Sequence, residues 1–449
     1  MPQLGPEAVT LFALAMARHV AGLRPASPSP STPSGMVAVY QKPAAPKRRK
    51  KPGARDGHAG ARRKAPAKID QKLEHRLEVC PCCGGELQRC QRQRKRIIED
   101  IPREITPIVT EHTVHRDYCP NCKRHVEPVV ADAMPNATLG HNLIALSSWF
   151  HYGLGVTLGQ VRDILASHLH TSVTAGGLVD GWRRLAAALE PWYQQIAREA
   201  KDSAVLHADE TGWRVNGQTH WLWCFCNHRH CYYQIDRSRG SPALQKFFSE
   251  AFAGTLVHDF WRAYESVCVE DRQYCLPHLL RELLKVDEHN DSIEWQAFAK
   301  QLRRLLRDGI RLRKRSDFDP KKYDSRIKLI HRRLCKLADD DTHDDADTRR
   351  LTERISRHRD HLFTFLEKLE VPFDNNHAER QIRPAVIIRK NSFCNRSEEG
   401  AHTQAVLMSV YRTLRLRGHD PTKTIADTLR KLLQTGTLPP LPVETVADG

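Results

Sequence analysis

The sequence lacks any apolar run near the roughly 18 residues that a membrane-spanning helix needs, so a membrane protein is not expected. No Lys or Arg precedes the apolar stretch of residues 9–17, and Arg18 and His19 follow it at once, which disfavours a secretory signal peptide. The 13 cysteines are odd in number and unevenly spread, which is not typical of a secreted disulfide framework. We therefore expect a cytoplasmic protein.

Acidic residues are in deficit: 53 Asp and Glu face 70 Lys and Arg among 449 residues, a net charge of +17. A solvating basic tail would explain part of this excess. However, Lys and Arg supply most of the affinity of proteins for phosphate backbones, so a nucleic-acid partner is favoured. Part of the excess lies in a basic arm that follows a Pro- and Ser-rich linker and contains Lys47, Arg48 and Arg49.

Two Cys-x-x-Cys pairs follow this arm, at Cys80 with Cys83 and at Cys119 with Cys122. Four thiolates at this spacing favour one structural Zn²⁺ in a closed tetrahedral site, and a redox pair or an iron–sulfur site is the alternative. Cys82 could substitute for Cys83. Alternating apolar residues between the pairs predict the strands of a zinc ribbon at 97–101 and 105–115.

Two helices are predicted next, at 158–169 behind Thr157 and at 175–188 behind Thr174, because Thr is a frequent helix N-cap. Their length and short connection are typical of a helix-turn-helix, whose second helix would offer Arg183 and Arg184 to DNA. A plain helical connector is the alternative.

Two acids stand directly after short apolar runs, Asp209 after Ala204–Leu206 and Asp259 after residues 256–257. Between them, Asn216-Gly217 predicts a hairpin turn. Strand, strand, strand, helix, strand is the beginning of a ribonuclease-H-like sheet, in which the first and fourth strands are parallel neighbours about 4.8 Å apart. A single Asp at a strand end is usually a cap, but this matched pair predicts a shared metal site. The adjacent Glu210 should point to the opposite face.

A third acid, Glu379, lies in a segment that can begin a helix. Cations suited to phosphate groups surround it: Arg380, Arg383, Arg389, Lys390 and Arg396. We expect His377 to orient this site. Cys275 and His278 either pack near the acids and orient them or begin a second zinc site, and we favour the first. The acids of 339–345 are expected to be solvated in a loop, which offers no rigid scaffold for a metal.

These segments together resemble the insertion-sequence-66 family of bacterial DDE transposases over residues 45–435. The resemblance is carried by Cys80-Pro-Cys-Cys-Gly-Gly85, by His207-Ala-Asp-Glu-Thr-Gly-Trp213, by Cys275-Leu-Pro-His278 and, most specifically, by residues 374–384. It implies that Asp209, Asp259 and Glu379 are the catalytic triad. The family's longer N-terminal coiled coil is here reduced to about residues 7–24.

The expected fold is multidomain α/β, a ribonuclease-H-like catalytic core with a helical insertion, preceded by a zinc ribbon and a helix-turn-helix-like DNA-binding region. The expected boundaries are a short N-terminal helix (1–24), a linker and basic arm (25–68), a zinc-binding domain (69–135), a helical DNA-binding region (136–200), the two parts of the core (201–288 and 371–435), the helical insertion (289–370) and a C-terminal tail (436–449).

Three carboxylates suit two Mg²⁺ or Mn²⁺ ions, at which a phosphodiester is hydrolysed and then transesterified. The expected partner is double-stranded DNA, both element ends and target, bound by a homo-oligomer near the nucleoid with possible helper proteins of the same element. An inactive zinc-bearing regulator and a ribonuclease-H-like nuclease remain as alternatives.

Overall fold

The computed structural model describes residues 66, 68–87, 95–102, 104–315, 319–340 and 342–445. The expected helix at 7–24 and the arm with Lys47, Arg48 and Arg49 lie outside these residues. The chain divides into a small unit, residues 42–106, and a large unit that contains residues 107–449. The large unit holds both the sheet and the insertion.

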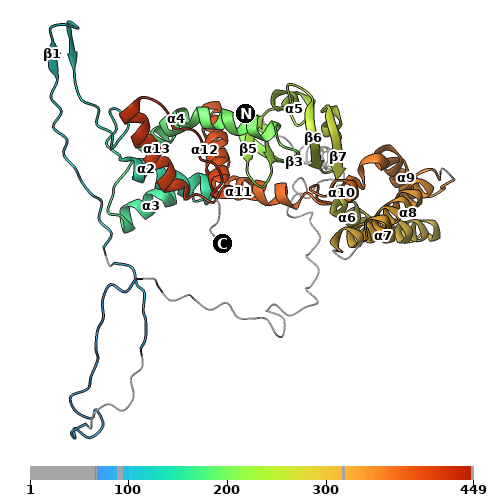
Figure 1. Ribbon diagram of the computed structural model, residues 1–449, viewed down its shortest axis with the longest axis horizontal. Coiled ribbons are helices and arrows are strands. Elements are labelled where there is room, and N and C mark those ends of the chain that lie inside the picture. The colour runs from blue at the N-terminus through green and yellow to red at the C-terminus, as the bar shows by residue number, and fades with distance from the viewer. Residues whose placement is uncertain are drawn as a thin grey trace, which may run out of the picture. The chain divides into compact units, whose positions relative to one another are not determined.

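A five-stranded sheet forms the centre of the large unit (Figure 1). Its strand order is β5-β4-β3-β6-β7, in which β3 pairs antiparallel with β4 and β4 with β5, whereas β3, β6 and β7 run parallel. The strands are β3 (Val205–Val215), β4 (Gln218–Cys226), β5 (Cys231–Asp236), β6 (Phe252–His258) and β7 (Val269–Tyr274). The predicted hairpin is confirmed, since Asn216 and Gly217 close it with positive φ angles.

The predicted pairing of the first and fourth strands is also confirmed. Leu206 lies opposite Leu256 and His207 opposite Val257 in a parallel register. Continued by two residues, this register brings Asp209 level with Asp259. Strand β6 ends at His258, but β3 continues to Val215, so Asp209 lies inside its strand beside the end of β6.

Helices cover the sheet and share one apolar core with it. Helix α4 (Ala175–Lys201) and helix α12 (Glu398–Leu416) pack on each other and on β5, and α2 (His141–Ser148) packs against α13 (Pro421–Thr435). Thr157 caps α3 (Leu158–His168) and Thr174 caps α4, as predicted. Helix α4 continues well beyond the predicted end at 188, through Pro191, because Trp192 and Ile196 extend its buried face and their packing offsets the cost of proline.

A helical insertion with its own apolar core lies between β7 and α11 (Asn376–Ser392). It consists of α6 (Leu276–Val286), α7 (Ile293–Lys314), α8 (Pro320–Ala338), α9 (Ala346–His358) and the short α10 (Thr364–Glu367). The sequence suggests one helix over 351–369, which is wrong. Buried Gln273 of β7 donates to the carbonyl of Leu362 and accepts from the amide of Phe365, and these bonds take the place of helical ones.

The predicted strands of the zinc ribbon are also wrong. Residues 97–101 and 105–115 form no strand in the described chain, and the short hairpin of β1 (Asp117–Cys119) and β2 (Arg124–Val126) brackets the second cysteine pair instead. An alternating pattern indicates an amphipathic strand but supplies no partner for its backbone hydrogen bonds. Ile108 and Val109 are accordingly almost fully exposed.

Asp345 differs from the expected solvated loop. It caps α9 through the amide of Thr348 and accepts hydrogen bonds from Asn290 and Ser292. Although partial burial opposes the shift, these bonds lower the pKa of Asp345 to about 2. The Asp345 carboxylate therefore stabilises the packing of the insertion, and structural hydrogen bonds already use its oxygens.

Candidate active site

The expectation that Asp209 ends a strand is wrong: it lies within β3, opposite Cys224 of β4, whereas Asp259 directly follows β6. Each carboxylate accepts a hydrogen bond from a backbone amide. The Oδ1 atom of Asp209 accepts from the amide of Glu210 at 2.9 Å, and Oδ1 of Asp259 accepts from the amide of Trp261 at 2.9 Å. Burial, then the charges of Glu210 and Asp259, raise the pKa of Asp209 well above its usual value. Burial, then Glu210, raise the pKa of Asp259 to about 7. Negative charge is thus concentrated where the end of β6 lies beside the middle of β3.

Glu210 is already neutralised within the protein. Its carboxylate accepts from Arg239 at 3.0 Å and from the hydroxyl of Tyr264 at 2.6 Å, and its side chain is 3% exposed. The Arg239 guanidinium lies between the rings of Trp221 and Trp261, 4.5 and 3.8 Å from their centres. These contacts make Glu210 a poorer metal ligand than its neighbour Asp209. No sequence pattern indicated this cation, because a single Arg in a loop forms no motif.

Asn375, which the sequence reading overlooked, joins three segments beside the acids. Its side chain donates to the carbonyl of Ala208 at 2.8 Å and lies 2.9 Å from Nδ1 of His207. Its amide donates to Sγ of Cys275 at 3.2 Å, and the amide of Cys275 donates to the carbonyl of His258 at 2.9 Å. One buried asparagine therefore joins the beginning of α11 to β3 at His207 and Ala208 and, through Cys275, to the end of β6.

Glu379 lies one helical turn after Asn375, whose carbonyl accepts from the Glu379 amide at 3.1 Å. Its carboxylate is 38% exposed, accepts from Nη2 of Arg281 at 3.1 Å and lies 3.7 Å from Nε2 of His278. Its charge contributes to the raised pKa of both Asp209 and Asp259. Glu379 thus faces the same region as the aspartates, but it is engaged by Arg281. Within the described residues, no three His, Cys, Asp or Glu side chains converge closely enough to hold a metal ion.

The Cys275 and His278 pair contacts the surroundings of all three acids. Burial raises the pKa of Cys275 to about 12, so its thiol stays protonated and accepts the Asn375 amide. Burial, then Arg281 and Lys285, lower the pKa of His278 to about 4. The pair supplies one thiol and one imidazole, fewer than the four ligands of a structural zinc site. These contacts support the orienting role over a second zinc site.

His377 orients the site indirectly. Its Nε2 lies 2.6 Å from the carbonyl of Asn227 in the β4–β5 turn, and its ring lies 5.3 Å from that of His207. Burial lowers the pKa of His377. This residue fastens α11 to the sheet edge.

The predicted DNA-binding cations fall into two groups. Arg380, Arg383 and Lys390 are exposed on α11. Three others are engaged within the chain: Arg389 donates to Thr211 and Gly212 of β3, Arg183 donates to Glu399, and Arg184 donates to the carbonyl of Pro135. The exposed group is therefore the one free to meet a phosphate.

Each cysteine pair forms a tight turn around its first thiol. In the first pair, the backbone amide of Cys80 donates to the Gly85 carbonyl at 2.9 Å, and Gly84 has a φ of +71°, a conformation that favours glycine. The amides of Cys82 and Cys83 lower the pKa of Cys80. In the second pair, the amide of Cys122 lies 3.5 Å from Sγ of Cys119 and lowers its pKa. Amide groups that stabilise a thiolate are what a zinc knuckle needs.

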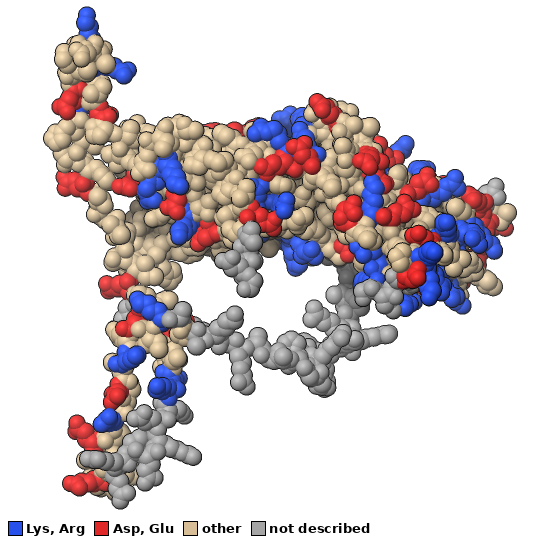
Figure 2. Space-filling model, in the orientation of Figure 1, with Lys and Arg blue, Asp and Glu red and all other residues tan. Residues whose placement is uncertain are grey.

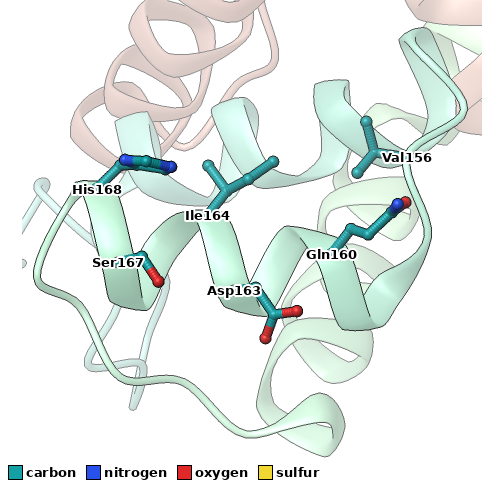
Figure 3. A pocket seen from close by; sticks show the side chains of 6 residues that line it. All are labelled: Val156, Gln160, Asp163, Ile164, Ser167 and His168. Carbon is teal, nitrogen blue, oxygen red and sulfur yellow. The ribbon is translucent and has the colours of Figure 1, made fainter.

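Two hollows of the described surface lie away from the acids. One of about 430 Å³ is lined by Val156 and by side chains along one face of α3 (Figure 3). The other, of about 320 Å³, lies among residues 134–184. Neither includes Asp209, Asp259 or Glu379. No described helix combines the length and apolarity needed to cross a bilayer.

Comparison with protein families identifies the class. Residues 136–403 match the family described as "Transposase IS66 family", and residues 78–123 match the "zinc-finger binding domain of transposase IS66". These domains indicate a transposase with a zinc-finger domain ahead of it. The first match covers more than half of the chain, which therefore belongs to the IS66 transposase family, as its motifs suggested. The zinc-finger match contains all four predicted cysteine ligands.

Three relatives come from Sinorhizobium fredii (strain NBRC 101917 / NGR234), and each is described as uncharacterized. The protein y4hP is 24% identical over 79% of this chain and 70% of its own length. The protein y4jD is 21% identical over 82% of this chain and 78% of its own length. The protein y4qI is 25% identical over 53% of this chain and 50% of its own length. These relatives match this chain over about half to four-fifths of its length.

Proposed function

We propose that this chain is an active transposase that binds the ends of a mobile DNA element and catalyses metal-dependent cleavage and strand transfer. Asp209, Asp259 and Glu379 hold the metal ions in this proposal. The observation that carries it is the parallel register of β3 and β6, which brings two half-buried aspartates level, Asp209 within β3 and Asp259 directly after β6. Structural proteins seldom place two acids together where each opposes the ionisation of the other.

The sheet supports a ribonuclease-H-like core. Three antiparallel strands are followed by two that run parallel to the first, and the first and fourth are neighbours. This is the order that the resemblance implied. The long insertion separates Glu379 from the aspartates in sequence, and Asn375 restores their proximity.

The donor set fits Mg²⁺ or Mn²⁺. Carboxylate oxygens are the ligands that these hard cations prefer. Burial and the charge of Glu210 raise the pKa of both aspartates, and a bound cation would offset that negative charge. Two such ions, when bound, stabilise the attacking and leaving oxygens of an in-line displacement. Glu379 completes the set after releasing Arg281, which is then free to meet a phosphate.

The proposed reaction has two phosphoryl-transfer steps. Water first attacks the phosphodiester at the element end; a new P–O bond forms, the bond to the 3′ oxygen breaks, and that oxygen leaves as a 3′-hydroxyl. This hydroxyl then attacks a target phosphodiester, so again one P–O bond forms as one breaks. Arg380, Arg383 and Lys390 neutralise the phosphates that flank the site. The acids hold their positions because β3, β6 and α11 are fastened together.

The remaining assignments complete the proposal. Cys80, Cys83, Cys119 and Cys122 hold one structural Zn²⁺, with Cys82 as the alternative second ligand. Helices α3 and α4 form the helix-turn-helix-like region, with Arg183 and Arg184 reaching DNA only after leaving their present partners. The protein acts on double-stranded DNA as a homo-oligomer in the bacterial cytoplasm, with helper proteins of the same element as further partners.

The test is incubation with a labelled duplex from the element end, a target plasmid and Mg²⁺. Labelled DNA joined to the plasmid is the expected product. Asp209→Asn, Asp259→Asn and Glu379→Gln should each abolish it, whereas Glu250→Gln, at an exposed position ahead of β6, should not. Cut but unjoined DNA would indicate a nuclease, and binding without any cut would indicate a regulator. Full joining by Asp209→Asn would refute the triad.

A further inference from the structure

Helix α7 of the insertion has two parallel stripes with identical spacing. Its inward stripe is apolar or small and buried: Phe298, Leu302, Leu305, Gly309 and Leu312. A side chain at Gly309 would meet the Phe363 ring at 2.7 Å, so the helix lies close against its core here. This stripe fixes which face of α7 points to the protein and leaves the other to solvent.

The outward stripe begins two residues later and repeats at the same intervals of four, three, four and three. It consists entirely of exposed cations: Lys300, Arg304, Arg307, Arg311 and Lys314. Two residues correspond to about 200° around a helix, so this stripe lies opposite the apolar one. Figure 2 shows Lys and Arg gathered at this end of the large unit, over α7 and α8 of Figure 1.

This cationic stripe is unfavourable to the isolated helix. Like charges three or four residues apart each destabilise a helix by about 0.2–0.5 kcal/mol, and surface helices usually alternate acids with bases instead. Helix α7 has seven Lys and Arg against two acids. One of these acids, Asp308, is shared by Arg304, Arg311 and Arg333, at 4.0, 3.7 and 2.8 Å. A single carboxylate neutralises little of this charge.

The neighbouring helix extends the basic surface. Helix α8 packs against α7 and has seven Lys and Arg against one acid. Lys321, Lys328 and Arg332 are exposed and follow one side of it, at intervals of seven and four. Two packed helices with the same sign of charge on their outer faces form a surface suited to a polyanion.

We propose that the outer faces of α7 and α8 bind the backbone of duplex DNA, separately from the cations of α11. The α7 stripe spans 14 residues, about 21 Å, which matches roughly six base pairs at ~3.4 Å each. Evenly spaced Lys and Arg side chains with no aromatic residues between them contact phosphate groups and do not recognise base sequence. The surface therefore takes any duplex, whether target DNA or DNA beside the element end, and its binding does not depend on the metal chemistry of the acids.

The test compares Lys300→Gln/Arg307→Gln with a matched control, Lys423→Gln/Lys431→Gln, which removes two exposed cations from α13. Fluorescence anisotropy in EDTA measures affinity across a salt series, for a random-sequence duplex and for a duplex from the DNA that flanks the coding sequence. Two lost phosphate contacts should make the slope of log K against log salt shallower by about 1.8. The control should retain the wild-type slope.

Each outcome bears on the surface alone, because EDTA prevents cleavage. An equal change on both duplexes supports a sequence-independent backbone contact. A change on the flanking duplex alone also supports the surface and assigns it to the element end. An unchanged slope on both duplexes, or an equal change in the α13 control, would overturn the proposal. Asp209→Asn should bind both duplexes like wild type, which separates this result from any failure of the catalytic proposal.

Discussion

Removing the charge of Asp259 should stabilise the metal-free protein while it abolishes activity. Burial and the charge of Glu210 raise the pKa of this carboxyl from 3.8 to about 7. The folded state therefore holds a proton that the unfolded state has released. The stability that Asp259 contributes is greatest below about pH 4 and is lost as the pH rises through about 7.

The size of the effect follows from this shift. About three pKa units at ~1.4 kcal/mol each give an upper bound of ~4 kcal/mol above neutral pH. Asn keeps an acceptor for the Trp261 amide but lacks the charge, which costs about 1 kcal/mol. We expect Asp259→Asn to raise the free energy of unfolding by about 1–3 kcal/mol at about pH 8, a few degrees in Tm for a unit of this size.

The assay is thermal unfolding in EDTA at about pH 8 and about pH 4, with Asp163→Asn as the matched control. The gain in Tm should be present at the higher pH and absent at the lower, where wild-type Asp259 is itself protonated. The control should show no gain at either pH. A lower Tm for Asp259→Asn at about pH 8 would refute the view that these acids repel one another.

Three further predictions follow from the contacts around the site and the cysteine pairs. Asn375→Ala leaves Ala208 and His207 without their buried partner, so it should lower the free energy of unfolding by about 1–3 kcal/mol. It should also raise the Mg²⁺ concentration that gives half-maximal cleavage. Asn376→Ala should change neither quantity. Added Mg²⁺ should raise Tm more at about pH 8 than at about pH 5.5, because protons compete for Asp209 and Asp259 at the lower pH; an equal rise at both would place the ion elsewhere. Metal analysis should find one Zn²⁺ per chain, and Cys119→Ser should remove it. Whichever of Cys82→Ser and Cys83→Ser loses zinc identifies the second ligand of the first pair. An unchanged zinc content in Cys119→Ser would exclude the proposed site.

Local sequence signals predicted the sheet well. Asn216-Gly217 specified its turn directly, and the apolar runs before Asp209 and Asp259 marked two buried strands whose parallel pairing the structure confirms. These signals succeed because turn geometry and burial depend on a few adjacent residues.

Long-range contacts set the features that the sequence did not predict. The helix expected at 351–369 is broken by Gln273, which is distant in sequence. Likewise, the ribbon strands at 97–101 and 105–115 had an alternating pattern but no ladder partner. A propensity or a periodicity gives no information about which backbone groups a remote side chain will take.

The candidate site shows the same division. The acids could be found because apolar runs precede Asp209 and Asp259 and because Glu379 lies in the first turn of a helix. In contrast, Asn375, Arg239 and the Arg281 contact to Glu379 depend on tertiary packing. Arg183 and Arg389 illustrate the converse, because they had suitable charge and position in sequence but are engaged by Glu399 and β3. Charge in a sequence therefore overstates the number of cations that are free for DNA.

The central claim is that Asp209 and Asp259 coordinate the catalytic metal ions directly. The most direct measurement is strand transfer by Asp209→Cys and Asp259→Cys in Mg²⁺ and in Mn²⁺, since the softer Mn²⁺ accepts a sulfur ligand more readily than Mg²⁺ does. We predict that both variants are inactive in Mg²⁺ and partly active in Mn²⁺, while Glu210→Cys shows no such switch. Equal inactivity in both metals, or the same rescue in Glu210→Cys, would contradict direct coordination by the two aspartates.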